Sequence, residues 1–148
     1  MLATHDIVWR LIVAAIAGSA LGLDRELRHK PAGLRTLGLV SLGSALLTLT
    51  GAELSASVQG DSIRVIQGIV TGIGFLGAGA ILQRQRDSSI HGLTTAAAIW
   101  VAAAVGIGFG LGLWVVASTG LGLALLLLSA TRPFERWLHR QAPPRPPH

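Results

Sequence analysis

Cysteine and asparagine are both absent from the 148-residue sequence. Without cysteine the chain has no disulfide, no thiolate metal ligand and no cysteine nucleophile, and without asparagine it has no N-glycosylation acceptor. Charged residues are also scarce, because they make up 13% of the chain against roughly 25% in soluble domains. The sequence therefore has too little charge to cover a water-facing surface, which argues against an ordinary soluble domain.

Signatures of enzymes are missing as well. The sequence shows no constellation of serine, histidine and acid, no P-loop and no dinucleotide fingerprint, so we expect no enzyme activity. Its net charge is +5, but the basic residues are dispersed between apolar blocks and do not form a basic face with interleaved aromatics. We therefore expect no nucleic-acid partner and no cofactor.

Apolar blocks dominate the chain and bring the hydrophobic residues to 51% and the mean hydropathy to +0.60. A bilayer core of ~30 Å needs roughly 17 to 25 helical residues to cross it, and the blocks have this length. They predict an all-α polytopic membrane protein, a bundle of five transmembrane helices. The predicted spans lie at about residues 7–23, 34–52, 63–82, 91–107 and 111–131.

The last two spans come from one apolar block, Ile90–Thr131, which is too long for a single crossing. A helix over that block would be roughly 60 Å long at 1.5 Å per residue, twice the thickness of the bilayer core. Every second residue from Gly106 to Gly112 is glycine, and glycine weakens a helix and favours tight turns. We therefore place the break between the two spans in this run.

Lysine and arginine in the loops predict the direction of the spans. They cluster in segments 24–35 and 83–92 and in the C-terminal tail, whereas segment 53–62 and the glycine run contain none. The positive-inside rule then places the N-terminus outside and the C-terminus in the cytoplasm. We expect one membrane domain over residues 1–132, followed by an interfacial or disordered proline-rich tail over residues 133–148.

Small residues at four-residue spacing let transmembrane helices approach one another closely. Glycines of this kind recur in the first and third spans, and we expect them to pack against neighbouring helices. They are Gly18, Gly22, Gly68, Gly72, Gly77 and Gly79. The stretch Gly77–Ala80 is where we most expect a further role, such as a helix break or a backbone group that faces a ligand.

A charged cluster, Asp24, Arg25 and Glu26, directly follows the first predicted span. Charges at membrane depth are costly, at about 3 kcal/mol for a helix centre, so their positions are informative. The cluster is either an ordinary charged helix end or a functional group that faces a polar cavity. Asp24 and Glu26 are the candidate metal ligands, but carboxylates two residues apart on a helix point to different sides. Joint chelation by both would require a distorted backbone.

Polar residues in two other spans allow a functional and a structural interpretation. Arg64, Gln67 and Thr71 lie on one side of the third span, where they could line a polar surface or hydrogen-bond a neighbouring helix. Thr94 and Thr95 lie near the start of the fourth span. Hydroxyl groups in membrane helices often bond their own backbone, so both roles stay open for the threonines.

Four stretches of the chain, in order, resemble the MgtC/SapB family of membrane proteins. They are Gly22–Glu26, Ala32–Thr36, Arg64–Gly68 with Thr71–Gly79, and Gly92–Ala97 with Trp100. Together they cover about residues 10 to 130, which is nearly the whole hydrophobic region. Each stretch alone is weakly specific, but four in order at compatible distances make a strong resemblance.

The resemblance implies a multi-pass protein of the bacterial inner membrane, whose relatives are tied to growth at limiting magnesium and, in pathogens, to survival inside host cells. Some relatives are thought to restrain the ATP synthase and not to carry magnesium. The site residues that it implies are Asp24, Arg25 and Glu26, with Arg35, Arg64 and Gln67 beside them. Many relatives continue into a cytoplasmic regulatory domain, so we expect a short form here.

Two functions from different classes follow. The first is a regulatory protein that adjusts the cell to low magnesium through a membrane partner such as the ATP synthase. The second is a transporter or channel component for a cation such as Mg²⁺, which would require a homo-oligomer because five spans are few for a lone transporter. The expected partners are the lipid bilayer, further copies of the chain and another membrane protein.

Overall fold

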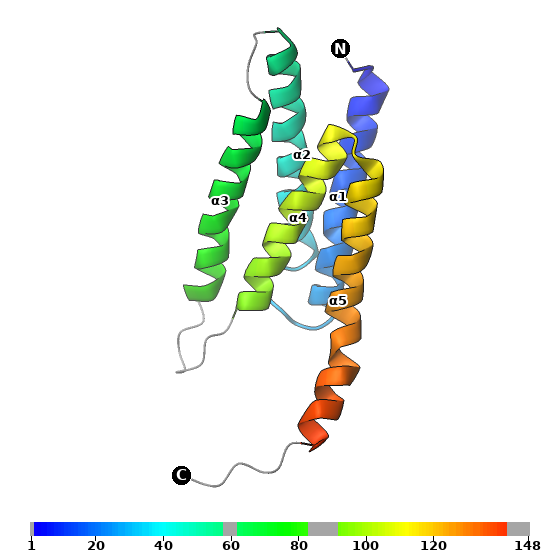
Figure 1. Ribbon diagram of the computed structural model, residues 1–148, viewed down its shortest axis with the longest axis vertical. Coiled ribbons are helices and arrows are strands. Elements are labelled where there is room, and N and C mark those ends of the chain that lie inside the picture. The colour runs from blue at the N-terminus through cyan, green and yellow to red at the C-terminus, as the bar shows by residue number, and fades with distance from the viewer. Residues whose placement is uncertain (1, 58–61, 83–91, 142–148) are drawn as a thin grey trace.

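The computed structural model describes residues 2–57, 62–82 and 92–141. Over these residues the chain forms five helices and is all-α, as predicted (Figure 1). The helices are α1 (Thr4–Glu26), α2 (Leu34–Ser57), α3 (Ser62–Leu82), α4 (Leu93–Leu111) and α5 (Trp114–Gln141). The last part of the predicted tail, residues 142–148, lies outside the described residues.

Four of the described helices are long and apolar enough to cross a membrane. Their apolar segments are Thr4–Glu26, Leu34–Leu54, Ile63–Ile81 and Leu93–Leu111, each 19 to 23 residues long. At 1.5 Å per residue they extend roughly 28 to 35 Å, which matches the bilayer core. The apolar segment described in α5, Trp114–Ser129, is shorter.

The central helix of the bundle is α4. Among the described residues it contacts all four other helices, whereas α3 contacts only α2 and α4. Figure 1 shows α3 along one edge and α5 along the opposite edge, with the C-terminal part of α5 extending beyond the other helices. Fully buried residues such as Ala14 of α1, Leu37 and Ala45 of α2 and Ala102 of α4 form the core. The core therefore lies between α1, α2 and α4.

Helices α2 and α4 approach each other at backbone distance. A Cβ atom at Gly106 would lie 2.8 Å from the carbonyl carbon of Ser41, and one at Gly110 would lie 2.9 Å from the carbonyl oxygen of Ala45. The buried Ser41 hydroxyl also donates a hydrogen bond of 2.7 Å to the carbonyl oxygen of Ala14 in α1. Glycine permits this approach because it has no side chain, and no larger residue fits between the two helices here.

The break in the long apolar block lies later than predicted. We expected one span to end near residue 107 and the next to begin near residue 111. Instead α4 runs on to Leu111 and α5 begins at Trp114. The earlier glycines of the run stay helical because they face neighbouring helices: Gly106 faces α2, and a Cβ at Gly108 would lie 2.9 Å from the Cβ of Ala117 in α5.

A single glycine makes the turn between α4 and α5. Gly112 has a φ of +76°, a conformation that glycine adopts without strain. Its N–H bonds to the carbonyl oxygen of Phe109 at 3.0 Å, and the N–H of Leu113 bonds to that of Gly108 at 2.9 Å. These two bonds form a Schellman motif, which closes a helix on one left-handed residue. The turn therefore needs Gly112 and not the whole run.

Candidate functional site

The chain returns from α1 to α2 through a short loop, residues 27–33. Two of its residues are not glycine and yet have positive φ, His29 at 52° and Ala32 at 58°. Such a conformation costs roughly 1 to 2 kcal/mol for an ordinary residue. Interactions elsewhere must therefore hold the loop in place, and the charged cluster at the end of α1 supplies them.

Arg25 is the centre of this cluster. Its side chain is only 3% exposed and donates to the carbonyl oxygens of Pro31, at 2.8 Å from Nη2, and Ala32, at 3.2 Å from Nε. Nη2 also donates to the hydroxyl of Thr95 in α4, at 2.5 Å. Hydrogen bonds from a charged donor are stronger than neutral ones. Arg25 thus ties α1, the loop and α4 together.

Glu26 holds the start of α2. Its Oε2 accepts a hydrogen bond of 2.8 Å from the backbone N–H of Leu34, the first residue of that helix. The first N–H groups of a helix have no partner within it, and a carboxylate there also interacts favourably with the helix dipole. Gly33 lies so close that any Cβ atom would overlap the same carboxylate. Glu26 therefore acts as a cap from outside the helix.

Asp24 has a third role. Its Oδ1 forms an ion pair with Arg28, four residues later in the loop that follows α1. Its Oδ2 is buried, and it has no hydrogen-bond partner among the described residues. A buried carboxylate oxygen without a donor is costly, and among the described residues of this cluster Oδ2 is the one buried polar atom in that situation.

We call Asp24, Arg25 and Glu26, together with the loop 27–33, the clasp. Its two carboxylates engage different partners, Arg28 and the N-terminus of α2. This agrees with the expectation that they point to different sides of the helix. Within the described ranges no group of three or more histidine, cysteine, aspartate or glutamate residues could hold a metal ion. The clasp is thus built mainly to join helices.

Other predicted residues divide between the clasp and the surface. Thr95 is buried and accepts from Arg25, whereas its neighbour Thr94 is exposed. Arg35 is exposed on the first turn of α2. Arg64 and Gln67 are exposed on α3, far along the chain from the clasp. The structure therefore brings Thr95 into contact with the charged cluster, leaves Arg35 and Thr94 exposed beside cluster contacts, and places Arg64 and Gln67 on another helix.

The predicted packing glycines also fall into two groups. Gly18 and Gly22 lie against α2: a Cβ at Gly18 would be 2.5 Å from that of Ser41. By contrast, a Cβ atom at Gly68, Gly72 or Gly79 of α3 would have no described atom within 4 Å. A Cβ at Gly77 would lie 3.5 Å from the Cβ of Ala96 in α4, which is an ordinary contact distance. Gly68, Gly72 and Gly79 of α3 thus face away from the rest of the bundle.

Arg10 is an interhelical link that the sequence pattern did not assign. It lies in α1 at the other end of the bundle, and its Nη1 donates to the carbonyl oxygen of Gly110 at 2.9 Å. A cation near the C-terminus of a helix is favourable, and Gly110 lies in the last turn of α4. Nε is buried and has no partner in the described part of the chain. The signal in the sequence was the charge itself, because an arginine inside an apolar span must find a partner.

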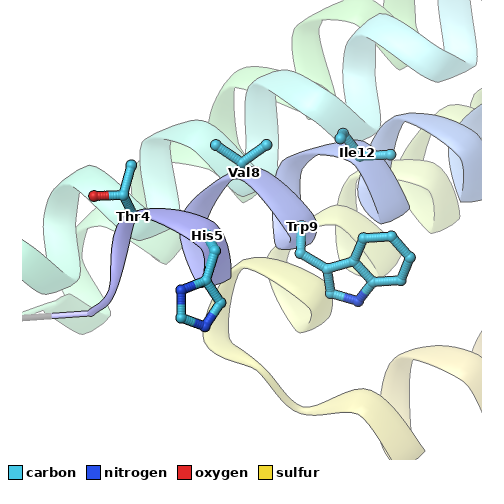
Figure 2. A pocket seen from close by; sticks show the side chains of 5 residues that line it. All are labelled: Thr4, His5, Val8, Trp9 and Ile12. Carbon is cyan, nitrogen blue, oxygen red and sulfur yellow. The ribbon is translucent and has the colours of Figure 1, made fainter.

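A shallow hollow lies near the N-terminus of α1. It is lined by Thr4, His5, Val8, Trp9 and Ile12, all from this one helix (Figure 2). Among the residues that the structure describes, no second element contributes a lining side chain, so polar groups from several elements do not converge on the hollow. Trp9 is 59% exposed near a helix end, the position where tryptophan commonly meets the membrane interface. We therefore assign this surface to contact with lipid.

A family model described as the MgtC family matches residues 11–137. YhiD of Escherichia coli K12, whose given name proposes a role as a magnesium transporter, is 46% identical over 110 residues, or 70% of this chain and 50% of YhiD. SapB of Bacillus subtilis is 38% identical over 108 residues, or 69% of this chain and 46% of SapB. MgtC of Brucella abortus is 46% identical over 96 residues, or 64% of this chain and 38% of MgtC.

The chain spans about half the length of these curated relatives. No solved structure matches it. The match covers the clasp, α2, α3 and α4, and the part of α1 from residue 11 onward.

Proposed function

Because the chain belongs to the MgtC family, we propose that this multi-pass membrane protein is a regulatory protein of the bacterial inner membrane. It supports growth at limiting magnesium by binding another membrane protein. The observation that carries the proposal is the close packing of α1, α2 and α4. Gly106 leaves no space between α2 and α4, and Arg25 closes the end of the bundle. A bundle filled in this way acts through its surface and not through a passage between its own helices.

The proposal includes a topology with five crossings, the N-terminus outside and the C-terminus in the cytoplasm. The 28 residues of α5 would extend about 42 Å at 1.5 Å per residue, long enough for a crossing. Arg132, Arg136 and Arg140 follow its apolar segment, as the positive-inside rule expects of a cytoplasmic end. The clasp then lies on the cytoplasmic side, where a partner can reach Asp24. The ATP synthase, which the family resemblance suggests, is the first partner to test.

The test is growth of a deletion strain at limiting magnesium, rescued by the wild-type chain or by Asp24→Asn at matched membrane abundance. Asparagine keeps the shape of Asp24 but removes the negative charge that pairs with Arg28 and that the buried Oδ2 shares. We expect wild type to rescue growth and Asp24→Asn to rescue it poorly. Lys30→Gln is the matched control, because it removes an exposed charge from the same loop and should rescue fully.

Three outcomes separate the parts of the proposal. A deletion strain that grows normally at every magnesium concentration would remove the magnesium role. Full rescue by Asp24→Asn would keep that role but show that the clasp is structural. Capture of a defined membrane protein with wild type, reduced by Asp24→Asn, would support action through a partner.

A cation transporter is the second candidate, and the buried, unpartnered Oδ2 of Asp24 favours it. Since the core of one protomer is closed, the path would have to lie between copies of the chain. The transporter predicts Mg²⁺ flux into proteoliposomes that falls when Asp24 is replaced by asparagine. Flux equal to that of empty liposomes would exclude it and leave the regulatory proposal standing.

A further inference from the structure

Of the four long apolar helices, α3 is the least buried among the described residues. At 100° per residue, one side of this helix carries the exposed residues Arg64 and Ala78 together with six further exposed residues, Gln67, Gly68, Thr71, Gly72, Phe75 and Gly79. The opposite side carries Ile69, Ile73 and Gly77, which are buried against the bundle. We call the six residues from Gln67 to Gly79 the α3 face.

Exposed helix surfaces elsewhere are largely aliphatic, although α5 also exposes Ser118, Thr119, Gly120 and Gly122. On α1 the exposed side chains include Ile12 and Ile16, and on α5 they include Val115, Val116 and Leu123. Such side chains suit contact with acyl chains. The α3 face instead presents glycine, threonine and glutamine, so its composition is that of a helix–helix interface in a membrane.

Nothing described in the protomer requires glycine on the α3 face. A Cβ atom at Gly68, Gly72 or Gly79 would meet no described atom within 4 Å. Glycine is less favourable than alanine in a helix by about 1 kcal/mol, and contact with lipid does not compensate for this. Small residues here become useful once another helix packs closely against them.

Gln67 supplies a second, independent argument. Its exposed amide lies one turn inside the apolar segment Ile63–Ile81, where a polar group without a hydrogen bond is costly. Thr71 does not have this problem, because its hydroxyl donates to the carbonyl oxygen of Gln67 at 2.8 Å. An amide carries both donors and an acceptor, so the same amide on a second copy is a complementary partner.

The shape of the α3 face also favours a second copy of the chain as its partner. Phe75 is 82% exposed and protrudes between the flat positions Gly72 and Gly79, which lie about one turn away on either side. Copies of one chain share their orientation in a membrane, so two α3 helices related by a two-fold axis lie parallel and at the same depth. The protruding ring of each copy then meets the glycines of the other. An interface of this kind uses the same patch on both subunits.

We propose that a second copy of this chain packs on the α3 face, with Gly68 and Gly72 at the helix crossing and Gln67 paired with its counterpart. The pairing does not depend on any role in magnesium supply, because it rests on α3 alone. It also places the two closed helix cores on either side of the paired α3 helices.

Single cysteines test this directly, since the natural chain has none. Gly72→Cys and Phe75→Cys place a thiol on the α3 face, and Val116→Cys and Leu123→Cys place one on the lipid-facing side of α5. Each variant is oxidised in native membranes, and the fraction that migrates at twice 15.4 kDa is measured. A disulfide requires Cα atoms within about 7 Å, so it reports direct contact between α3 helices. We expect several times more dimer for the α3 positions than for the α5 positions.

A second pair of variants links the dimer to the glycines. Gly72→Leu in the Phe75→Cys background should reduce the cross-linked fraction several-fold. Gly122→Leu is the control, because Gly122 of α5 also has open space around a Cβ position and lies away from the α3 face. Equal cross-linking at α3 and α5, a product of α3 at the mass of a different protein, or an unchanged dimer in Gly72→Leu would each overturn the proposal.

Discussion

Helices α3 and α4 have similar glycine-rich sequences but opposite environments. More than half of the residues in the apolar segment of α4 are buried, whereas in that of α3 only Ile69, Ile73 and Gly77 are buried. Gly106 and Gly110 of α4 contact the backbone of α2, while Gly68 and Gly72 of α3 face open space. A glycine pattern thus predicts that a helix approaches something closely, but it does not show whether the neighbour belongs to the same chain.

The contrast is sharpest for substitution by alanine. At Gly106 an added methyl group would overlap the backbone of Ser41, which has no side-chain freedom to move aside. Overpacking a filled core typically costs 1 to 3 kcal/mol, and we expect Gly106→Ala to lower the free energy of unfolding by ~3 kcal/mol. The measurement is the melting temperature in detergent, followed by the fluorescence of the four tryptophans. A melting temperature equal to that of wild type would mean that α2 and α4 are farther apart than described.

The two ends of the bundle offer a second comparison, since each has one arginine from α1 that reaches α4. Arg25 binds two loop carbonyl groups and Thr95, whereas Arg10 is described with one carbonyl partner, Gly110. The clasp end also holds a loop with positive φ at two non-glycine residues. More of the fold therefore depends on Arg25 than on Arg10.

Arg25→Lys tests how far the clasp depends on the geometry of guanidinium. Lysine keeps the charge, but its compact ammonium group cannot reproduce the planar fork that reaches Pro31 and Thr95 together. Losing hydrogen bonds from a charged donor should lower the stability by ~2 kcal/mol. The same change at Arg10 should cost less. Equal losses of melting temperature for Arg25→Lys and Arg10→Lys would contradict the difference between the two ends.

The neighbouring threonines of α4 give a finer comparison within the clasp. Thr95→Val keeps the shape of the side chain but removes the oxygen that accepts from Arg25, and we expect a loss of ~1 kcal/mol. Thr94→Val serves as its control, because Thr94 is exposed and its replacement by an apolar residue should leave the melting temperature near that of wild type. If Thr94→Val were the more damaging change, the placement of α4 against the clasp would be wrong.

The helices themselves were largely predictable, because the bilayer thickness fixes the length of an apolar span. The predicted starts at residues 7, 34, 63, 91 and 111 lie within three residues of the observed starts at 4, 34, 62, 93 and 114. The break between α4 and α5 lies three to four residues later than predicted, because local propensity does not distinguish a glycine that turns the chain from one that faces a neighbour. Gly112 turns the chain, and Gly106 and Gly108 do not.

The clasp was predictable in part. The cost of charge in a membrane singled out Asp24, Arg25 and Glu26, and helical spacing separated the two carboxylates. Their partners could not be found in this way, because Arg25 meets Thr95 from 70 residues away and Arg10 meets Gly110 from 100 residues away. Such pairings depend on how the helices pack, and a single apolar sequence is compatible with many packings. The direction of the spans stays a prediction.

The smallest expected effect, and the one of opposite sign, belongs to α3. Gly72→Ala adds a methyl group where no described atom lies within 4 Å, and alanine favours the helix by up to about 1 kcal/mol. In monomers isolated in detergent we therefore expect Gly72→Ala to leave the melting temperature unchanged or raise it slightly, whereas Gly106→Ala lowers it. In membranes the added methyl group should instead weaken the contact between two copies, which the Phe75→Cys cross-link measures. A fall in the stability of the detergent-isolated monomer would show that Gly72 packs against another helix of the same chain. Helices α3 and α4 would then use their glycines in the same way, contrary to the comparison made above.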